Sequence, residues 1–131
     1  MKIMDFDVLC EYVVKAHDRT LLKGQIPGLA PDKSLESVLQ RPYNRLQYGM
    51  VDDVFHLAAC FAVSIIRGHA FNDANKRTGL AVMALILKIN NIQIEHDQIE
   101  LADMMVAVAD NRVDEDGLAK WLRDGYVRFI E

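Results

Sequence analysis

The stretch DDVFHLAACFAVSIIRGHAFNDANKRTGLAVMALILKI, residues 52–89, decides the fold. It holds two runs, residues 52–67 and residues 75–89, in which apolar residues recur at helical spacing and cover nearly every side. A helix that is apolar all round lies in the interior of a protein. The polar segment between the two runs, residues 68–78, is therefore expected to be a loop that joins two central buried helices.

The rest of the chain shows the same helical periodicity, so we predict an all-α bundle of about six helices. Pro42 is expected to end or kink the helix in which it falls. Residues 21–31, with two glycines and two prolines, are expected to form a loop. The only brief strand-like alternation is at Ile92–Ile94. The remaining helices are expected from Asp5, over residues 32–40, over residues 97–111 and over residues 114–126.

Composition limits the class of protein. A chain of 131 residues with 51% hydrophobic and 26% charged residues fits a single globular domain over residues 1–131. The net charge of −4 argues against a protein that coats DNA or RNA, so no direct binding of nucleic acid is expected.

Targeting and redox signals are weak. The longest stretch without formal charge, residues 54–66, has thirteen residues, and a membrane span needs about 20. The acidic N-terminus does not resemble a signal peptide. Two distant cysteines, Cys10 and Cys60, are expected to be buried thiols in a reducing compartment. We therefore expect a soluble cytoplasmic protein without a membrane anchor.

The loop at residues 68–78 has the composition of an anion site. Arg67, Lys76 and Arg77 against Asp73 give a local charge of +2 in a chain of −4. The helix expected from Asn75 adds free backbone N–H groups and the positive end of its dipole, and phosphate is the usual ligand of such a site. Each polar residue alone also fits an ordinary helix cap or a solvated side chain. Their concentration within eleven residues favours anion binding.

The sequence contains no motif typical of a zinc site or of the common nucleotide-binding and hydrolase families. No histidine pair has the spacing of a zinc site, and no nucleophile elbow, dinucleotide fingerprint or Walker motif is present. His17, His56 and His96 lie within or near expected helices and are ranked below His69 as functional residues.

The segment His69-Ala70-Phe71-Asn72-Asp73-Ala74-Asn75-Lys76-Arg77 resembles the signature of the Fic/Doc family, and within it the Doc branch. The Fic branch has H-P-F-x-[D/E]-G-N-G-R, and the Doc branch has H-x-F-x-[D/N]-[A/G]-N-K-R. The family carries this motif on a loop between two central helices of an all-helical fold. Chain length and helix order extend the resemblance to essentially the whole chain.

The resemblance implies a role for each motif residue. His69 would be the general base that takes the proton of a hydroxyl nucleophile, which suits an imidazole near neutral pH. Asp73 would hold Mg²⁺ on the nucleotide phosphates. Asn75 and Arg77 would bind phosphate oxygens, and Phe71 would anchor the loop.

Lys76 decides the branch within this resemblance. In the adenylyl-transferring Fic enzymes the position is Gly, whereas a lysine fills that space and adds a charge next to the phosphates. The absence of the Fic proline at Ala70 and of the Fic glycine at Ala74 points the same way. The Doc branch presents the γ-phosphate of ATP to the nucleophile, so phosphoryl transfer is expected.

The expected function is that of a Doc-like toxin of a toxin–antitoxin system. It would be a protein kinase that transfers the γ-phosphoryl group of ATP to a threonine or serine of a translation factor, with elongation factor Tu as the implied target. A cognate antitoxin with a segment that folds on binding would block the site, since no inhibitory glutamate motif is found. Residues 43–51 are expected to form either an exposed flap or an irregular helix, and they are the candidate flap for the target peptide. The alternatives are a Fic-type AMP-transferase and a catalytically inactive helical protein that binds anions or nucleotides.

Overall fold

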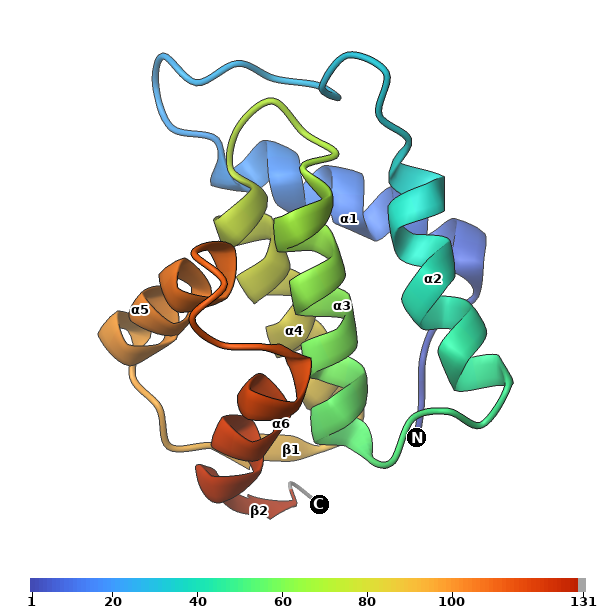
Figure 1. Ribbon diagram of the computed structural model, residues 1–131, viewed down its shortest axis with the longest axis vertical. Helices are drawn as coiled ribbons and strands as arrows, with labels where there is room; N and C mark the ends of the chain where they lie inside the picture. The colour runs from blue at the N-terminus through green and yellow to red at the C-terminus, as the bar shows by residue number, and fades with distance from the viewer. Residues whose placement is uncertain (130–131) are drawn as a thin grey trace.

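The computed structural model describes residues 1–129, and for residues 127–129 it describes the backbone alone. Within this range six helices and a small two-stranded sheet follow one another, which confirms the predicted all-α class (Figure 1). The elements in chain order are α1 (Phe6–Thr20), α2 (Leu35–Gln47), α3 (Val54–Gly68), α4 (Asn75–Ile89), β1 (Ile92–Ile94), α5 (Gln98–Ala109), α6 (Glu115–Asp124) and β2 (Tyr126–Phe129).

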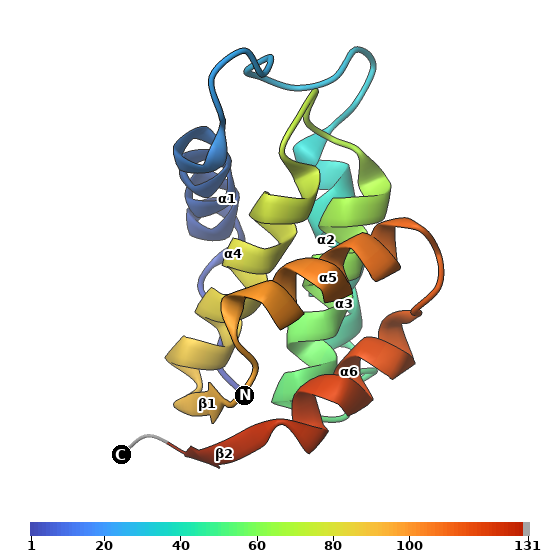
Figure 2. The ribbon, with the colours of Figure 1, turned by 90° about the vertical axis from the view of Figure 1, so that its left-hand side faces the viewer.

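Helices α3 and α4 form the centre of the bundle, as predicted. Helices α2 and α6 pack on α3, while α1 and α5 pack on α4 (Figures 1 and 2). The two central helices approach closely at Gly79, where an added Cβ would lie 2.8 Å from Cγ1 of Ile66. The core side chains of α3 are inaccessible to solvent, for example Leu57 and Phe61 at 0% exposure. This rigid pair holds both ends of the loop that joins it.

Helix α2 differs from the prediction, because it continues past Pro42 to Gln47. A proline inside a helix has no N–H to donate to the carbonyl four residues earlier, here that of Val38. In this structure the hydroxyl of Ser64 on α3 donates to that carbonyl instead, at 2.7 Å. The prediction that this helix ends by residue 40 is therefore wrong, because a hydroxyl on the neighbouring helix pairs with the carbonyl that the proline leaves without a donor. A kink at Pro42 stays a prediction.

The C-terminal part also differs, because the last helix ends at Asp124 and a strand follows. Strand β2 pairs antiparallel with β1, and the register pairs Ile92 with Phe129 and Ile94 with Tyr126. The brief alternation at residues 92–94 is thus a true strand. The sequence pattern did not predict its partner strand, β2, because the last helix was expected to run to residue 126.

Two further observations bear on the expectations from composition. Among the described residues, no helix is both long enough and apolar enough to cross a membrane. Both cysteines are free thiols, but Cys10 is only half-buried whereas Cys60 is fully buried. Burial and the neighbouring Glu115 raise the pKa of the Cys60 thiol to about 12. Cys60 is therefore a protonated core residue at neutral pH.

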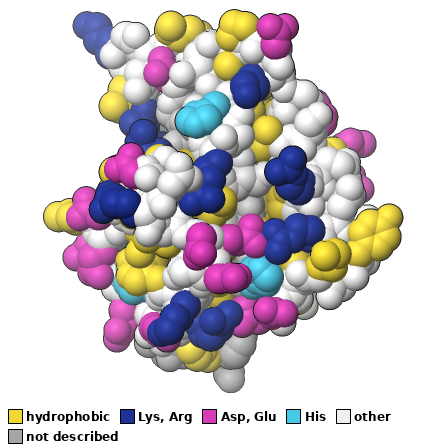
Figure 3. All heavy atoms as spheres, viewed as in Figure 1, with side chains coloured by type: hydrophobic (Ala, Val, Ile, Leu, Met, Phe, Trp, Pro, Cys, Tyr) yellow, Lys and Arg dark blue, Asp and Glu magenta, His cyan; other side chains and the backbone are white. Residues whose placement is uncertain are grey.

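A cavity of about 370 Å³ lies between α2, α3 and the start of α6, with Arg41, Arg45 and Arg67 among its lining residues. Figure 3 shows dark blue Lys and Arg side chains gathered over this part of the surface. In the cavity wall, Nη1 of Arg45 lies 2.7 Å from a carboxylate oxygen of Glu115, and His56 lies 3.2 Å from the same oxygen.

The charge on Glu115 in this cluster is paired within the protein itself. The ligand atoms of His56, Cys60 and Glu115 lie within 4.8 Å of one another. The guanidinium of Arg45 already supplies the positive charge beside Glu115, and a metal cation would have to displace it. Burial opposes the charge on Glu115, but hydrogen bonds from Arg45, Cys60 and His56 hold the pKa of that carboxyl below its ordinary value.

Candidate active site

The loop from His69 to Ala74 leaves the end of α3 and enters α4 at the upper edge of the molecule in Figure 1. Both of its ends adopt left-handed backbone conformations, with φ of 49° at His69 and 67° at Ala74. Residues other than glycine rarely adopt this conformation, which costs on the order of 1 kcal/mol or more. The loop is therefore held in its shape by the contacts that surround it.

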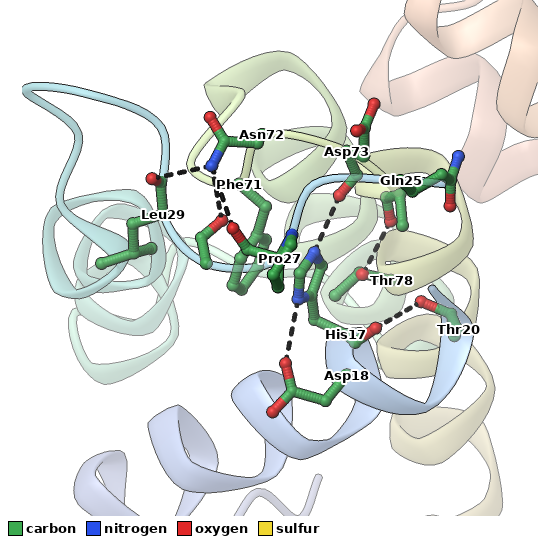
Figure 4. Close-up of polar contacts among 12 residues, drawn as sticks. His17, Asp18, Thr20, Gln25, Pro27, Leu29, Phe71, Asn72, Asp73 and Thr78 are labelled. Atoms are coloured by element: carbon green, nitrogen blue, oxygen red, sulfur yellow. Dashed lines mark hydrogen bonds and ion pairs between the residues drawn. The ribbon is translucent and has the colours of Figure 1, made fainter. Parts of the chain in front are cut away.

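One set of contacts comes from the segment between α1 and α2, which runs beside the loop (Figure 4). The N–H of Ala30 donates to the carbonyl of Ala70 at 2.8 Å, and the N–H of Asn72 donates to the carbonyl of Gly28 at 3.2 Å. The side-chain amide of Asn72 also donates to the carbonyls of Pro27 and Leu29, each at 3.1 Å. Residues 26–30 thus form a flap with strand-like pairing to the loop, which includes an isolated bridge between Leu29 and Phe71.

This position of the flap corrects the prediction that residues 43–51 form it. Residues 43–47 belong to α2, and the following turn leads into the N-terminus of α3. The loop leaves α3 at its other end, and 15 helical residues separate the two. A helix of that length spans about 22 Å, so residues 43–51 lie too far from the loop to serve as its flap.

The N-terminus of α4 is open to an anion. No side chain in the described part of the chain caps it, because its N-cap residue is Ala74. The first backbone N–H groups of a helix then remain available, and the helix dipole favours negative charge there. Lys76, in the first turn, is exposed and has no partner among residues 1–129. The structure thus contains the uncapped helix end and the free cation on which the predicted anion site depends, and anion binding there stays a prediction.

Asn75 and Arg77 have structural contacts that the sequence did not reveal. The side chain of Asn75 accepts from the N–H of Phe71 at 3.2 Å and donates to its carbonyl at 3.0 Å, so it closes the loop on itself. Arg77 donates from Nε to the carbonyl of Thr20 at 2.9 Å and from Nη2 to the side chain of Gln25. An arginine has five N–H donors, so most of those on Arg77 remain free for a phosphate.

His69 and Asp73 are placed differently relative to solvent. His69 is exposed, and its ring makes no hydrogen bond or ion pair with any residue that the structure describes. Asp73 is half-buried, and its Oδ2 accepts from the N–H of Ile26 in the flap at 2.8 Å. Its Oδ1 has no partner within residues 1–129 and remains available to a cation. One carboxylate oxygen together with phosphate oxygens is a donor set that suits Mg²⁺.

Phe71 and His17 form the buried base of the loop. Phe71 is 3% exposed, and His17 is fully inaccessible in the last turn of α1. Their rings stack with centroids 3.8 Å apart and planes 8° from parallel. The Nε2 atom of His17 also lies 2.8 Å from the carbonyl oxygen of Asp73 (Figure 4). His17 therefore joins the first helix to the motif loop.

Sequence reasoning ranked His17 low, although one signal could have placed it in the core. Leu9, Val13 and His17 are spaced four residues apart, and side chains at this spacing lie on one face of a helix. Leu9 and Val13 are fully buried, and His17 continues their row. A polar residue in such a row needs a buried hydrogen-bond partner, which here comes from a loop 56 residues away in sequence.

The all-helical fold agrees with the comparisons with known proteins. Residues 7–87 match the profile of the Fic/DOC family. This range covers α2, α3, the whole motif and nearly all of α1 and α4. The chain therefore belongs to the Fic/Doc family.

Within that family the chain is a homologue of a protein kinase. It is 35% identical over 117 residues to the protein kinase doc of Escherichia phage P1, a match that covers 88% of this chain and 92% of the phage protein. A protein kinase uses ATP as its phosphoryl donor, so this relationship implies ATP as the nucleotide.

Proposed function

We propose that this protein is a Doc-type toxin of a toxin–antitoxin system that transfers the γ-phosphoryl group of ATP to a threonine or serine of elongation factor Tu and so inhibits translation. The observation that carries the proposal is the uncapped N-terminus of α4, with free Lys76 beside it and exposed His69 at the other end of the same loop. The extended similarity to the phage P1 kinase supports it.

In the proposed reaction His69 is the general base. The acceptor hydroxyl oxygen forms a bond to the γ-phosphorus, the bond from that phosphorus to the β–γ bridging oxygen breaks, and ADP leaves. The proton of the hydroxyl passes to the free ring nitrogen of His69. The exposed, unpaired ring of His69 suits this step because it has no internal hydrogen bond to give up.

Positive charge around the α4 N-terminus stabilises the transferring group. Lys76 and the free donors of Arg77 would bind the phosphate oxygens, together with the first backbone N–H groups of α4. Asp73 would hold Mg²⁺ through its unpaired Oδ1, and the ion, when bound, neutralises phosphate charge. Asn75 would act from its place inside the loop, where it fixes the backbone of Phe71.

The flap at residues 26–30 is the proposed support for the acceptor peptide. It pairs with the motif loop and presents the exposed side chains of Ile26 and Leu29 next to it. A cognate antitoxin would act by folding a segment over this region and covering His69.

Mass spectrometry of the acceptor tests the proposal. Purified elongation factor Tu is incubated with ATP, Mg²⁺ and the protein, and its modified threonine or serine is mapped. Addition of one phosphoryl group supports the kinase. Addition of AMP would support a Fic-type AMP-transferase instead, and unmodified acceptor with retained nucleotide binding would support an inactive anion-binding protein.

A further inference from the structure

His17 is connected to the loop that carries Asp73 by two separate contacts. Its Nε2 lies 2.8 Å from the carbonyl oxygen of Asp73, and its ring stacks on Phe71. A carbonyl oxygen has no proton, so Nε2 must carry one and donate it. The other ring nitrogen, Nδ1, lies 3.4 Å from a carboxylate oxygen of the exposed Asp18. The site of donation from α1 to the loop is therefore Nε2.

The hydrogen bond from His17 acts on the residue proposed to hold the metal. Asp73 is fixed at its backbone by His17 and at its carboxylate Oδ2 by the N–H of Ile26. These two bonds come from different elements, α1 and the flap, and leave Oδ1 as the free oxygen. The next residue, Ala74, has the left-handed conformation that starts α4. The orientation of Oδ1 relative to the α4 N-terminus thus depends on the Asp73 backbone.

The burial of His17 makes its hydrogen bond to Asp73 costly to lose. His17 is 0% exposed, so water cannot replace a donor that is lost from its ring. A buried carbonyl without a donor is unfavourable, and the loop would shift to recover one. Groups that orient a metal ligand through a hydrogen bond commonly change metal affinity by about 10- to 100-fold when they are removed.

We propose that His17 is a positioning residue of the active site, which directs the free carboxylate oxygen of Asp73 toward a nucleotide-bound divalent cation through the Nε2–H bond to the Asp73 carbonyl. The proposal rests on the proposed function for the identity of the ligand. In this proposal a residue of α1, which lies outside the motif, orients the metal-binding residue of the motif.

Two amide substitutions separate the hydrogen bond from the ring. In His17→Gln the side-chain NH₂ can reach the position of Nε2, whereas in His17→Asn it reaches only that of Nδ1. His17→Phe keeps an aromatic ring against Phe71 but has no donor. Asp73→Asn is the reference for a damaged metal ligand. The melting temperature of each variant establishes that it folds, and the Gln and Asn pair decides the question if the Phe variant does not fold.

The measurement is the affinity for a non-hydrolysable ATP analogue, by calorimetry, with and without Mg²⁺. We expect Mg²⁺ to strengthen binding to the wild type and to His17→Gln alike. We expect that enhancement to fall by roughly ten-fold or more in His17→Asn, His17→Phe and Asp73→Asn. Metal-free affinity should be unchanged in the two His17 variants, whose substitution leaves the charge of Asp73 in place. Phosphoryl transfer should follow the same order, with a higher Mg²⁺ requirement and an unchanged KM for the acceptor protein.

Two outcomes would overturn the proposal. Wild-type enhancement in folded His17→Asn and His17→Phe would show that the bond does not direct Asp73. Equal loss in folded His17→Gln would assign the effect to ring stacking. If the wild type itself shows no Mg²⁺ enhancement, the proposed function fails, and amide exchange of residues 72–75 then tests the bond alone. Faster exchange in His17→Asn than in His17→Gln is the result expected from the bond, and equal exchange would contradict it.

Discussion

The hydroxyl of Ser64 donates a 2.7 Å hydrogen bond to the carbonyl of Val38, which is the helical carbonyl that Pro42 leaves without a donor. This bond allows α2 to pass through Pro42 and keeps it packed along α3. It also ties α2 to the helix that ends at the motif loop.

Loss of this hydroxyl should destabilise the protein in a way that depends on Pro42. Ser64→Ala leaves the Val38 carbonyl unpaired and should lower the free energy of unfolding by about 1–3 kcal/mol. Pro42→Ala restores a backbone donor to the same carbonyl, so the loss from Ser64→Ala should be smaller in the double variant. Urea unfolding of the four proteins measures the coupling. Strictly additive effects would contradict this account of the helix.

Substitutions at Phe71 and at Asp73 should have opposite effects: the first should lower mainly the stability of the fold, and the second mainly the activity. Phe71→Ala removes a buried ring and its stack on His17, and should cost about 3–5 kcal/mol of stability. Asp73→Asn should cost little, because the amide oxygen can still accept from the N–H of Ile26, but it should weaken Mg²⁺-dependent transfer. Denaturant unfolding and transfer assays on both variants test the assignment. The reverse order of stability losses would contradict it.

His69 should be needed for chemistry and not for folding. His69→Ala should lower phosphoryl transfer by at least about 100-fold, the usual contribution of a general base. Its melting temperature should stay close to that of the wild type, since the exposed ring contacts no partner among the described residues. Full transfer by the folded variant would remove His69 from the mechanism.

Glu115 should make the protein sensitive to acid. Its folded-state pKa lies below the ordinary value of 4.5, so the unfolded chain takes up the proton more readily. The stability that results is present above about pH 5 and is lost as the pH falls through the lowered pKa. Glu115→Gln should therefore show a shallower loss of stability between about pH 6 and pH 3 than the wild type. Glu11→Gln, on an exposed residue, is the matched control, and equal slopes for the wild type and Glu115→Gln would contradict the assignment.

Local patterns in the sequence were sufficient to predict the central helices. The runs at residues 52–67 and 75–89 are apolar on nearly all sides, and a helix of this kind lies in the interior of a protein. Their boundaries lie within two residues of the observed α3 and α4. The motif loop follows from the same pattern, because it is the polar interval between them.

The remaining features depend on contacts between distant residues. The path of α2 through Pro42 requires a hydroxyl from α3, and β2 requires pairing with residues 92–94. The flap lies at residues 26–30 because its backbone pairs with a loop about 40 residues away. Neither this pairing nor the bond from His17 to Asp73 has a local signature in the sequence.

Lys76 should determine which phosphate is transferred. Lys76→Gly removes a charge-assisted contact to phosphate worth roughly 1.5–3 kcal/mol, and should lower γ-phosphoryl transfer ten-fold or more. The glycine also permits the closer backbone approach found in the Fic branch, so weak AMP transfer is expected to appear. Paired assays of the wild type and the variant test this, and undiminished γ-phosphoryl transfer by Lys76→Gly would contradict it.

The proposed activity is phosphorylation of elongation factor Tu. Its most direct test incubates the wild-type protein and purified elongation factor Tu with Mg²⁺ and ATP labelled at either the α- or the γ-phosphate. We predict that the γ-label, and not the α-label, passes to elongation factor Tu. Transfer of the α-label without the γ-label would contradict the kinase and identify an AMP-transferase.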